Sequence, residues 1–415
     1  MQSKYRYLFL LALADIFLLL AILYRYEWQV TPKIADESEI LISASEMEAA
    51  DSLGKPIKPT PPDVQKLKLL NTQKLVTGRG VKSVFFDESG KYLYSVNLES
   101  GSVYEFDRAS KHRRRYWKFD QTPAKGYDYS KRKWVEGSFA EKPVEGCLTH
   151  KGKYLWASWH NAGGVAAWRV DGDTAGLHQA EHRADLVEGE DQTRVAVHFF
   201  KTGETPKVLL PSPDGQWLFA ANWHSKTGSC IDMSGDNPRS WQVRKSIKVG
   251  AVPRGMCLVG ERELWVAGMA SGSITRIDLR TLGILGDKDV GPTPRHLLNH
   301  QGRVYASLSS SEELLELNAK DASIRQKART ADDPRTIAIS PDGRLLFVVC
   351  YAANRLQVFR TSDFALLGSW KCQGGPVGVD VYQSGDTVEV WVGNYKYATL
   401  KVFRIALIRE GSTAS

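Results

Sequence analysis

Basic side chains recur in this 415-residue chain at one position of a repeated unit, most clearly just after a proline. The three arginines of this series lie 41 and 40 residues apart, and the next unit begins 42 residues later. The recurring position holds five cations, one acid and one apolar residue: Lys82, Lys207, Arg254, Arg295, Arg335, Glu145 and Val377. If these positions surround one axis, the five cations form a positive funnel that attracts anions.

Amides, imidazoles and aromatic rings follow the second strand of several units. We expect this loop to return to the face on which the first strand starts, so that it forms the rim of the funnel. Together with the five cations, the predicted ligand-binding residues are Asn97, His160, Asn222, His224, Asn394 and Tyr395. Such a rim suits a phosphate, a carboxylate or an anionic glycan. The alternative is structural: the arginines bond loop carbonyls between units, and the tryptophans pack there.

A repeated four-stranded meander must position these residues. The unit around Pro341–Gly343 predicts strands at 336–340, 345–351, 355–360 and 366–371, and its Pro-Asp-Gly sequence predicts a tight turn. Seven such units, with a period near 40 residues, predict an all-β, seven-bladed β-propeller over residues 72–407. The last unit lacks its fourth strand, so we expect residues 73–77 to supply it and close the ring.

The unit at 333–372 resembles the bacterial YVTN-type, YncE-like propeller repeats, in which a strand, Ser-Pro-Asp-Gly and a second strand succeed one another. The resemblance implies the architecture and leaves the function open. Related propellers include sugar lactonases, haem-binding reductase domains and surface proteins. A lactonase-like enzyme that uses His160 or His224, and a haem or quinone redox propeller, therefore remain alternatives to a binding or assembly platform.

Two insertions depart from the repeat, at 116–142 and 171–205. Long loops often carry specificity, and elongated outer strands that cross between units are the alternative interpretation. The first insertion is basic and aromatic, a composition that can hold single-stranded nucleic acid. We nevertheless expect no nucleic-acid partner, because the propeller is predicted to be exported.

The export prediction rests on residues 7–24, an apolar run broken only by Asp15. Its twelve Leu, Ile and Phe residues favour insertion by roughly 4–7 kcal/mol, whereas one central Asp costs about 2.5–3.5 kcal/mol. Basic residues precede the run and acidic ones follow it, so residues 1–6 should stay cytoplasmic. We expect a single-pass anchor in the inner membrane, a linker at 25–71, a periplasmic or extracellular propeller and a tail at 408–415. A cleaved signal peptide is the alternative, and the absence of glycosylation sequons favours a bacterial envelope.

No sequence motif assigns a catalytic residue, a metal or a cofactor. The chain has no Cys-x-x-Cys-His haem-attachment motif, and its five cysteines are scattered, with Cys350 and Cys372 able to pair after export. His178 and His182 have helical spacing without the rest of a zinc motif. The sequence therefore predicts a platform that binds an anionic small molecule or glycan, with an envelope protein as a possible partner.

Overall fold

The computed structural model describes residues 63–409, apart from 129–132 and 175. The predicted anchor at 7–24, the preceding residues 1–6 and most of the linker lie outside the described residues. Within the described part, no helix is long and apolar enough to span a bilayer. The three described helices are single 3-10 turns, η3 (Leu177–Gln179), η4 (Pro238–Ser240) and η5 (Tyr395–Tyr397).

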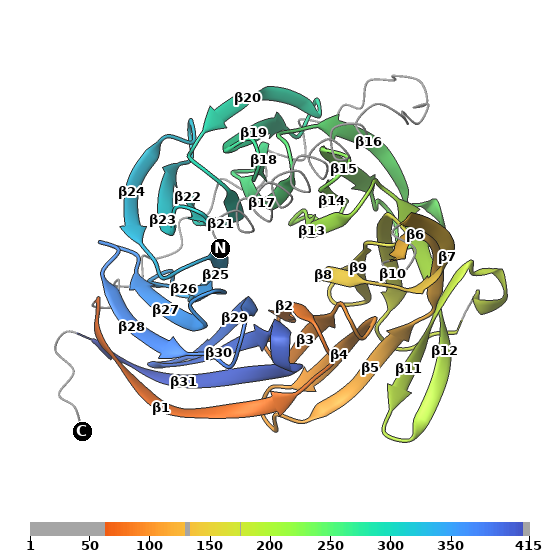
Figure 1. The fold of residues 1–415 in the computed structure, drawn as a ribbon, viewed down its shortest axis with the longest axis horizontal. Coiled ribbons are helices and arrows are strands. Elements are labelled where there is room, and N and C mark those ends of the chain that lie inside the picture. Colours follow the sequence, from red (N-terminus) through yellow and green to blue (C-terminus); the bar gives the residue numbers. More distant parts are fainter. Residues whose placement is uncertain (1–62, 129–132, 175, 410–415) are drawn as a thin grey trace, which may run out of the picture. The chain divides into compact units, whose positions relative to one another are not determined.

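Residues 63–409 form an all-β ring of antiparallel sheets, as the repeats predicted (Figure 1). Four regular sheets contain four consecutive strands each. The first contains β13 (Pro206–Pro211), β14 (Trp217–Asn222), β15 (Thr227–Asp232) and β16 (Gln242–Lys248), and the second contains β17 (Pro253–Val259), β18 (Glu263–Gly268), β19 (Ser273–Asp278) and β20 (Gly283–Asp289). The third contains β21 (Pro294–His300), β22 (Arg303–Leu308), β23 (Glu313–Asn318) and β24 (Ile324–Arg329). The fourth contains β25 (Pro334–Ile339), β26 (Leu345–Cys350), β27 (Arg355–Arg360) and β28 (Leu366–Lys371).

A nine-stranded sheet joins two four-stranded meanders through one bridging strand. Its strands, in spatial order, are β2 (Val81–Phe86), β3 (Tyr92–Asn97), β4 (Ser102–Asp107), β5 (Arg113–Phe119), β11 (His182–Glu188), β12 (Asp191–Lys201), β10 (Gly164–Arg169), β9 (Tyr154–Trp159) and β8 (Pro143–Thr149). Strand β11 pairs with β5 on one side and with β12 on the other. The insertion at 171–205 therefore supplies outer strands that cross between units, which was the alternative interpretation.

The insertion at 116–142 has a different structure. Its first residues belong to β5, and the rest forms a separate hairpin of β6 (Gln121–Asp128) and β7 (Lys133–Ala140). In Figure 1 this hairpin lies at the outside of the ring. The basic and aromatic stretch is thus divided between an outer strand and a hairpin, away from the first strands of the sheets.

The ring closes by pairing the N-terminal strand of the described residues with the C-terminal one. Strand β1 (Val64–Val76) lies beside β31 (Thr399–Arg409), which continues to β30 (Thr387–Asn394) and β29 (Pro376–Ser384). The predicted closing strand pairs with the last strand as expected, and the two strands extend to Val64 and to Arg409. The strand starts early because Val64 and Leu67 are buried against the sheet of β25–β28.

Each central strand is buried on both faces because a neighbouring sheet packs on each side. All six residues of β26 are inaccessible to solvent, as are most of β9 and β14. The first strands lie nearest the centre of the ring, and β16, β20, β24 and β28 lie outside (Figure 1). Each first strand contacts the next in the order β2, β8, β13, β17, β21, β25, β29, and β29 contacts β2. All five cysteines are free thiols, so the structure contains no Cys350–Cys372 bond.

Candidate functional site

A repeated backbone device aims the predicted cations at the centre of the ring. The residue before the proline has a positive φ in several copies, with 55° at Thr205, 59° at Val252, 51° at Thr293 and 54° at Asp333. A register shift follows in each first strand, for example between Pro253 and Met256. Positive φ is costly for β-branched residues, and a bulge turns a side chain away from regular alternation. The positive φ and the bulge together orient the side chain of the residue after the proline.

The five cations come together as predicted, and we call Lys82, Lys207, Arg254, Arg295 and Arg335 the axial cation cluster. Two members have carboxylate partners. Arg254 Nη2 lies 2.6 Å from Glu145 Oε1, across 109 residues of sequence. Arg335 donates to Asp333 Oδ2 at 2.9 Å. The arginines therefore do not bond loop carbonyls in the described structure, which was the structural alternative.

Aromatic rings from the loops after the second strands stack on the cations. The Lys207 ammonium lies 4.2 Å from the centre of the Trp223 ring, and the Arg335 guanidinium lies 3.6 Å from that of Tyr351. Lys82 lies 4.0 Å from the ring centre of Tyr395, across the ring closure. These contacts place the loops on the same face as the starts of the first strands, as predicted. The rings attract the cations without neutralising them.

Three members of the cluster have no carboxylate within ion-pair distance among the described residues: Lys82, Lys207 and Arg295. Burial, with Arg254 and Lys82, lowers the pKa of Lys207 to about 6. Burial, with Arg254 and Arg335, lowers the pKa of Lys82 to about 8 and, with the same two neighbours, that of Arg295 to about 9. The Arg295 guanidinium instead faces the sulfur of Met269 at 3.9 Å. The axial cation cluster therefore holds more positive groups than its carboxylates neutralise.

His160 belongs to this cluster, whereas His224 lies at its edge. Burial, followed by Lys207 and Arg254, lowers the pKa of His160 to about 2, so its imidazole is neutral. His224 is exposed, and its Nδ1 lies 2.6 Å from Thr205 Oγ1. The two histidines therefore have different surroundings despite their equivalent loop positions.

Three buried polar atoms around the cluster have no hydrogen-bond partner in the described structure. They are Arg254 Nη1, His160 Nε2 and Trp223 Nε1. An unpaired buried donor costs about 1–3 kcal/mol. Native proteins rarely leave such groups together unless water or a ligand meets them.

The predicted asparagines serve the loops themselves. Asn97, Asn222 and Asn394 are fully buried, and their side chains bond neighbouring backbone or hydroxyl groups. Asn222, for example, donates to Ser229 Oγ at 2.9 Å and accepts from Thr202 Oγ1 at 2.9 Å. They shape the loops that carry the rim residues, and direct ligand contact by these amides stays a prediction.

Sequence reasoning missed three residues of the opening: Met269, Asp333 and His296. Burial, with Arg254 and Arg295, lowers the pKa of His296 to about 3. Met269 holds the same loop position as Trp223, so its place in the repeat was an available signal. Asp333 directly precedes Pro334 and was likewise visible. His296 follows Arg295, and only the register shift in β21 explains why both of these side chains lie in the cluster.

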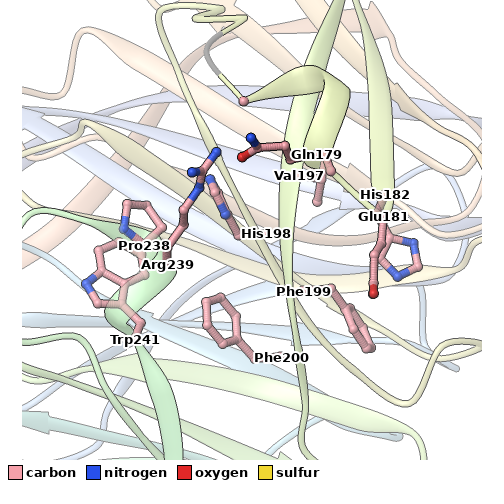
Figure 2. A pocket seen from close by; sticks show the side chains of 12 residues that line it. Gln179, Glu181, His182, Val197, His198, Phe199, Phe200, Pro238, Arg239 and Trp241 are labelled. Atoms are coloured by element: carbon pink, nitrogen blue, oxygen red, sulfur yellow. The ribbon is translucent and has the colours of Figure 1, made fainter.

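A cavity of about 570 Å³ lies elsewhere, between β12, the segment around η3 and the turn at η4. Figure 2 shows Arg239 and His198 on one side, with Glu181, His182 and Phe199 on another. His178 lies on η3 and His182 on β11, so they do not share a helix face. Among the described residues, no group of three or more histidines, cysteines or carboxylates is placed to hold a metal ion.

The chain matches no known family profile. Over 228 residues it is 27% identical to Antigen Lp49 of Leptospira interrogans serogroup Icterohaemorrhagiae serovar copenhageni, strain Fiocruz L1-130. That match covers 49% of this chain and 48% of the antigen, so it spans about half the length of this curated relative.

Solved structures share the fold at low sequence identity. Virginiamycin B lyase from Staphylococcus aureus superimposes with a TM-score of 0.56 and 12% identity, over 83% of this chain and all of the lyase. A streptogramin B lyase gives 0.59 and 11%, over 83% and 98% of the two chains. The β-propeller domain of Myceliophteria thermophila Cps50 (Swd1) gives 0.57 and 10%, over 80% and 99%. At these identities the likeness establishes fold alone: residues 63–409 have a β-propeller fold.

Proposed function

We propose that the protein is a β-propeller platform that binds an anionic ligand group at the axial cation cluster. The proposed ring has seven blades of the YVTN type, with the nine-stranded sheet taken as two blades joined by β11. The ligand group belongs to an anionic glycan, a phosphate or carboxylate compound, or an acidic partner protein.

The observation that carries this proposal is the surplus of buried positive charge at one opening. Five cations face two carboxylates, and Arg254 keeps a buried donor atom without a partner in the described residues. Like charges held together in a poorly hydrated site cost stability unless a counter-charge neutralises them. A bound anion supplies that counter-charge.

Neutralising the three arginines together tests the proposal. Full-length protein and the variant Arg254→Gln/Arg295→Gln/Arg335→Gln are titrated calorimetrically with acetate, phosphate, citrate and a heparin oligosaccharide. At least one anion should bind the wild-type protein and fail to bind the variant, while both unfold cooperatively. A matched control replaces three outer cations, Arg244, Lys245 and Arg280, by glutamine and should retain binding. Equal binding by the axial variant and the wild type would exclude this site.

The location is part of the same proposal. Residues 7–24 would anchor the chain in an inner membrane, with the propeller in the periplasm or outside the cell. In spheroplasts, added protease should then degrade the propeller, whereas a cytoplasmic control protein survives. Protection of the propeller until the membrane is dissolved would contradict export.

An enzyme that uses the same opening is the second candidate. It is favoured by the neutral imidazole of His160, whose Nε2 is buried and unpartnered beside Lys207 and Arg254 in the described structure. At a pKa of about 2 this imidazole is a weak base, so its role in such an enzyme would be to position the substrate by a hydrogen bond in its neutral form. Hydrolysis of sugar lactones by the purified protein, lost in His160→Ala or in His224→Ala, would establish this activity. If the protein binds anions but hydrolyses no lactone, the result supports the binding platform over the enzyme.

A further inference from the structure

We propose that the ligand group at the axial cation cluster is a doubly charged oxyanion of the phosphate-monoester type, and that its binding takes up a proton. This inference rests on the proposed function and specifies the ligand class of the same site. A single carboxylate or a phosphodiester, each with one negative charge, is the excluded alternative.

The number of unpaired cations in the cluster indicates how many negative charges the ligand carries. Glu145 and Asp333 each neutralise one arginine, at 2.6 and 2.9 Å. Lys82, Lys207 and Arg295 remain without carboxylate partners among the described residues. When all three are protonated in the anion-bound state, one negative charge leaves two of these cations uncompensated, whereas a dianion leaves one. Lys207 and Arg254 are buried and the other three members are partly buried, so a residual charge in the cluster is costly.

The arrangement of donors favours an oxyanion with several oxygens. Lys207, Arg254 and Arg295 lie at the same position on β13, β17 and β21, which contact one another in that order. Arg254 already spends Nη2 on Glu145 and keeps Nη1, which is buried and unpartnered in the described structure. A tetrahedral oxyanion can accept from Arg254 Nη1 and from the flanking cations with different oxygens. A planar carboxylate presents only two oxygens.

Proton uptake follows from the surroundings of Lys207, which is buried, lies 4.2 Å from the centre of the Trp223 ring and has no carboxylate within ion-pair distance among the described residues. Burial and neighbouring cations hold the pKa of Lys207 at about 6 and that of Lys82 at about 8. Near pH 7.5, Lys207 is therefore mostly uncharged before the anion arrives. A dianion favours the ammonium form, so each lysine pKa rises and a proton enters from the buffer.

Calorimetry of the full-length protein at pH 7.5 tests both parts. The probes are glycerol 3-phosphate as a soluble monoester, dihexanoyl phosphatidic acid as a lipid monoester, dimethyl phosphate as a diester, and acetate. We expect at least one monoester to bind at least about tenfold tighter than the diester and acetate. The two monoester arms distinguish a soluble source from a lipid headgroup, and binding in either arm supports the inference.

Titration in three buffers of different ionisation enthalpy measures the proton. We expect uptake of about half to one proton per monoester. Uptake should fall in Lys207→Met and persist in Lys245→Met, a control on the outer strand of the same sheet.

The outcomes separate this inference from the proposed function. Equal affinities for monoester, diester and acetate without proton uptake would overturn the dianion inference and leave an anion site in place. Binding of none of the probes, with a heparin oligosaccharide also failing, would overturn both. Monoester binding that survives the arginine-to-glutamine triple variant would show that the oxyanion binds elsewhere and would equally overturn the inference.

Discussion

Cations on the second and third strands of the sheets differ from those of the axial cation cluster in how they are neutralised. On these strands a basic side chain faces a carboxylate on the adjacent strand: Arg276 lies 2.8 Å from Glu263, and Arg303 lies 2.6 Å from Glu316. At the centre, Lys207 and other members of the cluster have no such partner among the described residues.

The difference teaches which cations serve the fold. Cross-strand ion pairs such as Arg276–Glu263 contribute to strand pairing and are complete within the protein. The axial cations cost stability through burial and mutual repulsion, and the strained residues before the prolines add to that cost. A chain that maintains such an arrangement gains something other than stability from it.

Both regions exist only while the ring is closed, so removing β1 should have the largest effect. A chain that begins at residue 80 lacks the strand that pairs with β31 from Val76↔Thr399 to Val64↔Arg409. Loss of this pairing exposes a sheet edge and the apolar side chains of β31. We expect cooperative thermal unfolding to disappear, measured by calorimetry against a chain that begins at residue 63. Equally sharp transitions at the same temperature would show that β1 does not close the ring.

Removing one carboxylate from each region should have unequal consequences. Glu145→Gln leaves the buried Arg254 guanidinium without its partner and should cost about 2–3 kcal/mol in the free energy of unfolding. Glu263→Gln breaks a pair whose side chains are 22% and 20% exposed, more than the 8% and 17% of Arg254 and Glu145, and should cost less, about 1 kcal/mol. Urea denaturation of the two variants measures both values. Similar losses in the two variants would mean that the ion pair of the axial cation cluster and the cross-strand ion pair do not differ in their contribution to stability.

Removing one cation from each region should change stability in opposite directions. Arg295→Met removes a buried charge that has no carboxylate partner in the described structure, and should raise the free energy of unfolding by up to about 1 kcal/mol. Arg303→Met leaves the buried Glu316 carboxylate without this partner and should lower it by about 1–2 kcal/mol. The melting temperature of the ligand-free protein, relative to wild type, reports both signs. Destabilisation by Arg295→Met would show that Arg295 stabilises the folded protein.

The last expected effect is a pH dependence that arises at the centre. Between about pH 6, the folded pKa of Lys207, and its ordinary value of 10.5, the unfolded state binds more protons at this lysine. The free energy of unfolding should therefore rise with pH across that window. Urea midpoints at pH 6, 7, 8 and 9 should rise more steeply for wild type than for Lys207→Met. Parallel profiles would mean that Lys207 is protonated in the folded protein.

Local patterns in the sequence predicted much of this fold. The Ser-Pro-Asp-Gly turn forms as expected: Leu345 donates its backbone N–H to Ser340 Oγ at 3.0 Å, and Gly343 has a φ of 73°. The strands around it begin and end within two residues of their predicted bounds. Such features follow from neighbours in sequence, and a regular repeat multiplies them around the ring. The axial position of Arg254, Arg295 and Arg335 was predictable for the same reason.

Only the tertiary structure decided how those cations differ from one another. Nothing local indicates that Glu145 pairs with Arg254, 109 residues away, or that Arg295 meets the sulfur of Met269, because both contacts depend on how separate sheets pack together. The positive φ of Thr205, for instance, contradicts the local preference of a residue before proline. The sequence by itself determined the units and their period, since those depend on short-range turns and alternation. Closure of the ring decided the charge balance at its centre, since that balance depends on which first strands become neighbours.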